Sequence, residues 1–509
     1  MGSRFTRRRF LRAASAAAAY LALTGAVGSE TPEYSSKVRS SRDPKVKPLP
    51  GASFPPEGVW AFRSRPDLDP PVVEVATEAR NDTAPGYIFL APEKGGAGKG
   101  GSMIIDDGGQ VVWFYPLRGP YGRAMNFETQ TYQGRDVLTW GQTPGEYVIF
   151  DSSYREIARL TAANGYDGDH HEFLISPQDT AMITIYNAVP RDLSSVGGSK
   201  DSVAIQGIVQ ELDIHTGEVL FEWRSIDHVA LEETYVTPSE DHYPGIDYFH
   251  LNSIDVEPDN NLLISARETS AVYKIDRKTG EVIWRLGGKK SDFEMGPGTQ
   301  FAFQHDARRL PDGTVSIFDN GSLIFENGTP EAVEESRAIV LELDEERMRA
   351  SLVREYTHPD KQYADAAGNM QVLPNGNVFV GWGRGLAVSE FSKDGKLLFD
   401  FRVSPEHRTY RAFRFPWSGS PSDQPAAVAE RTSENELEVY ASWNGATDIA
   451  AWEILAGPHP GLLESLGSIP RDGFETAMVV QTSEPYIAVQ AKHRSGRVLG
   501  TSPLVEARS

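Results

Sequence analysis

Three histidine-containing motifs stand at the starts of segments that favour β-strands, and they give the chain its most reactive side chains. The motifs are DHHEF with His170 and His171, DYFHLNS with His250, and QHDARRL with His305. Imidazole can act as a nucleophile, a general acid or base, or a metal ligand. A single buried histidine is commonly a packed, hydrogen-bonded residue. Three at matching positions of a repeat indicate a shared site, because equivalent positions of repeated units converge.

Polar residues near these histidines are candidates for supporting roles. Arg267 ends the strand-like segment LLISAR, and its guanidinium is expected to hold an anion beside the histidines, with a structural ion pair as the alternative. Glu172, Asp306 and Asn252 follow the histidines closely. We expect their side chains to orient the imidazole tautomers through hydrogen bonds.

A repeated strand pattern indicates how these residues are positioned. Six segments combine β-favouring residues with a central Asp or Gly turn, as hairpins do: 103–115, 148–160, 210–223, 273–286, 341–356 and 389–402. A second strand-like segment precedes each of them: 86–92, 125–141, 171–186, 250–267, 305–320 and 369–383. Two hairpins per unit make four strands. The sequence therefore predicts an all-β chain whose residues 86–402 form a six-bladed β-propeller, with the segment before residue 86 available to close the ring.

The pattern changes after residue 402. The segments EVYASW, AAWEIL and YIAVQAKH alternate apolar and polar residues over a stretch with the size of one β-sandwich. We expect residues 403–425 to be a linker and residues 426–509 to form a sandwich that resembles a fibronectin type III module. In that interpretation EVYASWNGATDIAAWEIL is its central hairpin.

The first 30 residues are typical of an export signal. Arg7 and Arg8 precede Phe10 and Leu11, and an alanine-rich apolar stretch follows. This is the pattern of a twin-arginine signal peptide, which is read by the export machinery for folded proteins. Residues 31–85 are expected to form a tether and an N-terminal strand segment. We therefore expect an extracellular or periplasmic protein, and association with the cell envelope stays open.

Composition excludes several classes of protein. The formal net charge is −21, which argues against nucleic acid and anionic lipid as partners. Cysteine is absent, so disulfides, thiolate zinc sites and cysteine nucleophiles are excluded. The Gly-rich GGAGKGG at 95–101 lacks the strand–loop–helix setting of a phosphate-binding loop.

A series of motifs resembles the arylsulfotransferase family. These are DHHEF, DYFHLNSID, LLISARETSAVYKID, GEVIWRLGGKKSDF, FQHDARRLPDGTVSIFDNG and GNMQVLPNGNVFVGWG, which follow one another in order within 86–402. The resemblance implies a six-bladed propeller that moves a sulfuryl group from a phenolic sulfate ester to a phenol. It also implies a reaction without the nucleotide donor of cytosolic sulfotransferases, and without a cofactor or a metal. The disulfide of the family's enterobacterial-type members is impossible here, and a homodimer stays open.

The resemblance also implies roles for individual residues. His305 would be the nucleophile that becomes sulfated, and His250 and Arg267 would bind the sulfuryl oxygens. His171 would bind those oxygens or protonate the leaving phenolate. His170 is expected to point elsewhere, because successive residues of a strand face opposite ways.

Two other classes of function remain open from the sequence. One is a catalytically silent propeller that binds carbohydrate or cell-wall ligands through its C-terminal module. The other is a metal-dependent propeller hydrolase or lyase, because three imidazoles can also bind zinc. Fold alone does not decide among them.

Overall fold

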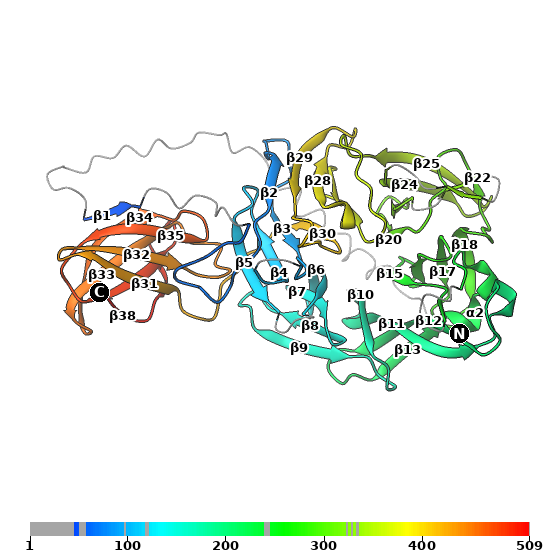
Figure 1. Cartoon of the computed structure of the whole chain (residues 1–509), viewed down its shortest axis with the longest axis horizontal. Helices are drawn as coiled ribbons and strands as arrows, with labels where there is room; N and C mark the ends of the chain where they lie inside the picture. The colour runs from blue at the N-terminus through cyan, green and yellow to red at the C-terminus, as the bar shows by residue number, and fades with distance from the viewer. Residues whose placement is uncertain are drawn as a thin grey trace, which may run out of the picture. The chain divides into compact units, whose positions relative to one another are not determined.

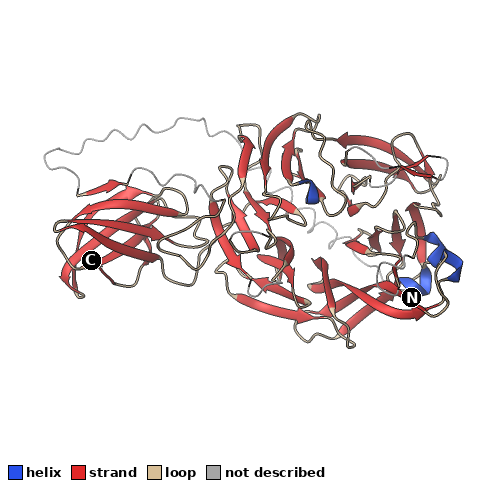
Figure 2. Ribbon diagram, in the orientation of Figure 1, coloured by secondary structure: helices blue, strands red, loops and turns tan. Residues whose placement is uncertain are grey.

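The computed structural model describes residues 45–49, 58–95, 98–117, 122–238, 245–321, 324–326, 329–331 and 335–507. Strands make up 51% of the structure and helices 3%, so the chain is all-β, as expected (Figure 2). The short helical elements of the described residues are η1 (Ser194–Val196), α2 (Ser225–His228), η2 (Leu231–Glu233) and η3 (Gly383–Gly385). None of the helices described is long and apolar enough to cross a membrane.

Six antiparallel sheets with four consecutively paired strands dominate the described residues. The first contains β30 (Ala412–Phe415), β3 (Tyr87–Leu90), β4 (Gly101–Ile105) and β5 (Val111–Pro116). The second contains β6 (Ala124–Tyr132), β7 (Arg135–Gln142), β8 (Glu146–Phe150) and β9 (Glu156–Thr161). The third contains β10 (Gly168–Ile175), β11 (Thr180–Arg191), β12 (Ser202–Asp213) and β13 (Val219–Arg224).

The remaining three sheets continue the same order along the chain. The fourth contains β15 (Leu251–Val256), β16 (Leu262–Ala266), β17 (Ala271–Ile275) and β18 (Val282–Gly287). The fifth contains β20 (His305–Arg309), β21 (Val315–Asp319), β24 (Arg337–Asp344) and β25 (Arg349–Tyr356). The sixth contains β26 (Asn369–Val372), β27 (Val378–Gly381), β28 (Ala387–Phe391) and β29 (Leu397–Arg402). Short added strands are β14 (Ile246–Asp247) beside β12, β19 (Glu294–Met295) beside β25, and the separate pair β22 (Ile324–Glu326) and β23 (Thr329–Glu331).

The first strands of the six sheets contact one another in a closed sequence. Strand β6 contacts β10, β10 contacts β15, β15 contacts β20, β20 contacts β26, β26 contacts β30, and β30 returns to β6. Figure 1 shows the sheets following one another around these strands. Apolar cores lie between neighbouring sheets, as where Leu263 and Val272 of the fourth sheet pack with Ile317 and Ile339 of the fifth. Residues that begin successive first strands are therefore brought toward a common centre.

The ends of the ring are joined differently from the sequence prediction. Strand β30 lies at 412–415, within the segment expected to be a linker, and it pairs with β3 to complete the first sheet. Strand β2 (Glu74–Thr77) pairs with β29 at the edge of the sixth sheet. The boundary at residue 402 is therefore wrong. The first sheet lacks its own innermost strand, and a segment distant in sequence supplies it.

Two further sheets follow and share one core. One contains β31 (Ala426–Ser433), β32 (Glu436–Ser442), β35 (Glu475–Gln481) and the early strand β1 (Val46–Pro48). The other contains β34 (Leu462–Pro470), β33 (Ala451–His459), β36 (Tyr486–Lys492), β37 (Val498–Thr501) and β38 (Val505–Glu506). Val439 of the first and Trp452 of the second belong to the same buried cluster. The expected central hairpin is wrong, because β32 and β33 belong to opposite sheets.

Candidate active site

The three predicted imidazoles meet, although they come from three different sheets. His171 lies on β10, His250 immediately precedes β15, and His305 begins β20. The ring centroids of His171 and His250 are 5.0 Å apart. The ring of Tyr410 joins the third, with its centroid 5.3 Å from that of His171 and 6.1 Å from that of His305. The matching positions in the repeat thus produce one cluster, which we call the imidazole cluster (His171, His250 and His305).

Irregularities in strand register occur beside each of these histidines. The pairing of β10 shifts between Asp169 and Phe173, and that of β20 shifts between His305 and Arg308. His250 itself has a φ of 55°, a left-handed conformation that is uncommon for residues other than glycine. Bulges bend a strand and change the direction of its side chains. Side-chain direction in the site therefore does not follow simple strand alternation.

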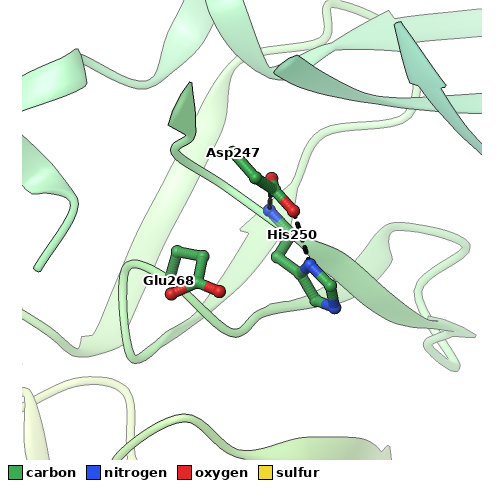
Figure 3. Close-up of side chains that lie close together, drawn as sticks. All are labelled: Asp247, His250 and Glu268. Atoms are coloured by element: carbon green, nitrogen blue, oxygen red, sulfur yellow. Dashed lines mark hydrogen bonds and ion pairs between the residues drawn. The ribbon is translucent and has the colours of Figure 1, made fainter. Parts of the chain in front are cut away.

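Two of the imidazoles are backed by carboxylates. His171 Nδ1 lies 2.5 Å from Asp169 Oδ1. His250 Nδ1 lies 2.6 Å from Asp247 Oδ2, and Figure 3 shows this second pair. Each carboxylate fixes its ring through Nδ1 and leaves Nε2 for other partners. Burial lowers the pKa of His171, while the charge of Asp169 opposes that shift. The opposing influences on His171 suit its ring to carry a proton that is gained and lost during a reaction.

His305 has a different partner, and its tautomer can be deduced. Its Nδ1 lies 2.7 Å from Oδ1 of Asn320, whose Nδ2 donates to the carbonyl oxygens of Ala364 (2.8 Å) and Ala367 (3.0 Å). Those two carbonyls fix the amide, so its oxygen must accept from Nδ1–H. The lone pair of His305 is then on Nε2, which accepts a long 3.2 Å hydrogen bond from the backbone N–H of Ala367. Burial, followed by the charge of Arg267, lowers the pKa of His305 well below its ordinary value, so the ring is neutral.

Arg267 lies directly after β16 and is only partly paired. Its Nη1 forms an ion pair with Glu268, and its Nη2 donates to the carbonyl oxygen of Asp365 at 3.4 Å. Its guanidinium also stacks over the ring of Phe303 at 5.1 Å. Its Nε is buried and has no hydrogen-bond partner. The ion-pair alternative is thus present, yet the guanidinium retains a donor that an anion could use.

The residues that follow the histidines do not orient the imidazoles, which corrects the sequence prediction. Glu172 pairs with Arg308 at 2.5 Å and with Arg411 at 3.2 Å. Asp306 accepts from Arg308 Nε at 2.8 Å. These four side chains form what we call the buried charge cluster (Glu172, Asp306, Arg308 and Arg411). The reason is geometric, because the register shifts at β10 and β20, and the left-handed backbone of Asp306 itself, turn these side chains toward other partners than the adjacent ring.

Asn252 also differs from its expected role. Its Nδ2 donates to the backbone carbonyl oxygen of Gln304 at 2.7 Å, and its backbone carbonyl oxygen accepts from Arg411 at 2.8 Å. It therefore links neighbouring first strands instead of holding a ring. His170, which was expected to point elsewhere, accepts a 3.4 Å hydrogen bond from the backbone N–H of Gly145.

Several residues of the site were missed from the sequence. Tyr186 stacks on His171 with ring centroids 5.2 Å apart, and Tyr410 and Arg411 enter from the supposed linker. The sequence did contain a signal for the aspartates that bond the imidazole rings, because an aspartate precedes the histidine in both DHHEF and DYFH. No comparable signal marked Tyr410 and Arg411, because their place depends on β30 completing a sheet that begins more than 300 residues earlier.

One group of residues beside the imidazole cluster could hold a metal ion. Asp247, His250 and Glu268 each offer one ligand atom, and these atoms lie within 4.8 Å of one another (Figure 3). Among the parts of the chain that the structure describes, this is the one group of its kind.

Comparisons with known proteins give a family match over the same region. A family model described as Arylsulfotransferase (ASST) matches residues 128–404, which include the imidazole cluster and Arg267. No curated protein matches the chain. Similar solved structures include a protein of unknown function from Bacteroides caccae, at 14% identity and a TM-score of 0.40, covering 65% of this chain and 98% of that one. Another is a catalytically inactive virginiamycin B lyase from Staphylococcus aureus with quinupristin, at 8% identity and a TM-score of 0.34. That match covers 80% of this chain and 99% of the lyase chain.

Proposed function

The chain belongs to the arylsulfotransferase family, and we propose that it moves a sulfuryl group from a phenolic sulfate ester to another phenol through an intermediate on His305. One observation carries this proposal: the amide of Asn320 fixes His305 as a neutral imidazole with its lone pair on Nε2. A neutral imidazole is a competent nucleophile, and a covalent adduct divides the exchange into two easier displacements.

The first displacement transfers the sulfuryl group to the protein. Nε2 of His305 forms a bond to sulfur while the bond between sulfur and the phenolic oxygen breaks. The phenolate leaves and takes a proton from His171 or His250. The long hydrogen bond from Ala367 to Nε2 must break before this attack. Asn320 remains bonded to Nδ1–H and stabilises the positive charge that develops on the ring.

The second displacement regenerates the protein. The oxygen of the acceptor phenol forms a bond to sulfur while the sulfur–nitrogen bond breaks, and the phenolic proton returns to His171 or His250. Asp169, which is bonded to Nδ1 of His171, favours the protonated ring that donates in the first displacement, and the neutral ring left behind accepts the phenolic proton in the second. We assign His250 and the unpaired Nε–H of Arg267 to the sulfuryl oxygens, whose charge requires cationic or N–H partners, as in phosphoryl transfer.

The test is a direct search for the adduct. The purified chain is mixed with 4-nitrophenyl sulfate, quenched rapidly, digested and analysed by mass spectrometry. We expect a sulfuryl group on the peptide that contains His305, with one equivalent of nitrophenol released before phenol is added. His170→Ala is the matched control, because His170 is adjacent to the site but bonds Gly145. An adduct on His171 or His250 would refute the role of His305, and the absence of any adduct with active protein would refute the covalent route.

The architecture proposed for this function is a six-bladed propeller with a fibronectin type III-like module. Six four-stranded sheets whose first strands form a closed sequence of contacts support the propeller. In the module, a β31–β32–β35 sheet faces a β34–β33–β36–β37 sheet around a common core, which supports the sandwich.

We also propose that the chain is exported by the twin-arginine route. The motif at residues 7–11 supports this, and it lies outside the residues that the structure describes. Replacing Arg7 and Arg8 with lysine should leave the precursor in the cytoplasm, as measured by cell fractionation. Unchanged export of that variant would contradict the proposal.

A further inference from the structure

We propose that Asp247, Glu268 and one ring nitrogen of His250 bind a divalent cation of the first transition row beside the site of sulfuryl transfer. The three residues come from two neighbouring sheets: Asp247 lies on β14, which pairs with β12, whereas His250 and Glu268 flank β15 and β16. One ligand atom of each lies within 4.8 Å of the other two, so an ion placed between them would be within reach of all three (Figure 3).

The carboxylate of Glu268 provides the strongest evidence for a missing partner. Glu268 is 5% exposed, and its Oε2 is buried without a hydrogen-bond partner. Buried polar atoms in proteins are nearly always satisfied, and a carboxylate oxygen is among the most costly to leave alone. Its other oxygen, Oε1, already accepts from Arg267. The carboxyl group that carries this unpaired oxygen is the same one that supplies the ligand atom close to Asp247 and His250.

The charges around the imidazole cluster give a second, independent reason. Three carboxylates contact the members of this site: Asp169 contacts His171, Asp247 contacts His250, and Glu268 pairs with Arg267. A phenolic sulfate ester is an anion, and an excess of carboxylates disfavours its approach. A divalent cation reverses the sign of the local charge. This second reason rests on the proposed function, whereas the unpaired oxygen of Glu268 does not.

The donor set indicates the class of ion. Two carboxylates with one imidazole suit Mn²⁺, Co²⁺ or Zn²⁺ better than Mg²⁺, which prefers an all-oxygen shell. Binding through Nδ1 would replace the hydrogen bond of His250 to Asp247 and release the proton of that ring nitrogen.

The neighbouring pair of Asp169 and His171 supplies a natural control. It repeats the contact between a carboxylate and Nδ1, yet it is not part of the group of three ligands. A cation that needs all three ligands should therefore bind beside His250 and not beside His171.

The experiment measures metal binding itself, without reference to catalysis. The full chain is freed of metal with a chelator and titrated with Co²⁺, whose visible absorption reports nitrogen and oxygen ligands, and with Mn²⁺ in an equilibrium binding assay. We expect one ion per chain in the wild type and in Asp169→Asn. Glu268→Gln and the more exposed Asp247→Asn should each weaken binding by more than about tenfold.

Two results would overturn the proposal. One is the absence of binding to the wild type at millimolar Co²⁺ and Mn²⁺, and the other is unchanged binding by either Glu268→Gln or Asp247→Asn. Because the readout is binding, a chain that binds the ion but transfers no sulfuryl group would refute the proposed function and leave the cation site intact.

Discussion

The imidazole cluster and the buried charge cluster have adjacent members on β10 (His171 and Glu172) and on β20 (His305 and Asp306), yet they are built in opposite ways. The difference lies in their partners and not in burial: the side chains of His171 and Arg308 retain 18% and 20% exposure, whereas His305 and Arg411 are buried. Each imidazole is held through Nδ1 by one neighbour. The carboxylates of the charge cluster are shared by two guanidiniums, and Arg411 also reaches the carbonyl oxygen of Asn252.

This difference indicates that the imidazole cluster is suited to catalysis and the buried charge cluster to stabilising the fold. A ring with one partner and one remaining nitrogen can exchange protons or ligands without disturbing the strand. A buried ion pair cannot, because removing one member leaves a charge without compensation. On β10 and β20 a reactive side chain and a stabilising one therefore lie one residue apart, at the register shifts of these strands. Substitutions in the two clusters should therefore have different consequences, one for turnover and the other for folding.

The largest effect is expected at the nucleophile. His305→Ala should abolish sulfuryl transfer, because no covalent route remains, while the chain stays folded. The measurement is nitrophenol release from 4-nitrophenyl sulfate in the presence of phenol, with circular dichroism as the check on folding. Substantial turnover by a folded His305→Ala variant would show that the imidazole cluster does not work as proposed.

The next effect concerns stability. Arg411→Met breaks ion pairs of a fully buried residue, so it should lower the free energy of unfolding by about 3–5 kcal/mol. The matched control is His250→Asn, because asparagine tolerates the left-handed backbone at this position. It should change the free energy of unfolding by less than about 1 kcal/mol. Denaturant titration followed by tryptophan fluorescence gives both values, and equal losses in the two variants would erase the distinction between the clusters.

A smaller loss of rate is expected from the residues that bind the sulfuryl oxygens. His250→Asn and Arg267→Ala should each retain weak transfer, reduced by about 100–1000-fold, because each removes one stabilising donor and leaves the nucleophile. Steady-state kinetics with 4-nitrophenyl sulfate measures the loss. Complete inactivity of His250→Asn, at unchanged stability, would assign it a role beyond that of a donor.

The smallest effect is a displacement of the pH profile. Attack requires neutral His305, and its pKa is lowered by burial and then by Arg267. The acidic decline of kcat/KM in the wild type should therefore fall below the ordinary histidine pKa of about 6.5. Arg267→Gln removes a positive charge, raises the pKa of His305 and should move this decline to higher pH. The control variant is Arg349→Gln. Arg349 is an exposed residue of the outer strand β25 that pairs with Glu294, so this variant should leave the pH profile unchanged.

Local sequence determined most of the strands and the meeting of the histidines. The segments with Asp or Gly turns at 273–286 and 389–402 correspond to β17–β18 and β28–β29, because turn residues between β-favouring flanks specify a hairpin without distant help. Matching positions in successive units were sufficient to predict that His171, His250 and His305 converge. That prediction needed only the repeat, since repeated units place equivalent residues around one centre.

Tertiary structure alone decided which side chains the histidines contact. Asp306 follows His305 in the sequence, yet Asn320 across the β20–β21 pair holds the ring, because the register shift at β20 sends the two neighbours to opposite faces. Tyr410 and Arg411 join the site because β30 completes a sheet begun at β3, a contact that no local pattern encodes. The sequence by itself thus determined the repeat and the residue types at its centre. The bulges and the closure of the ring, which depend on packing between distant segments, decided the direction of each side chain.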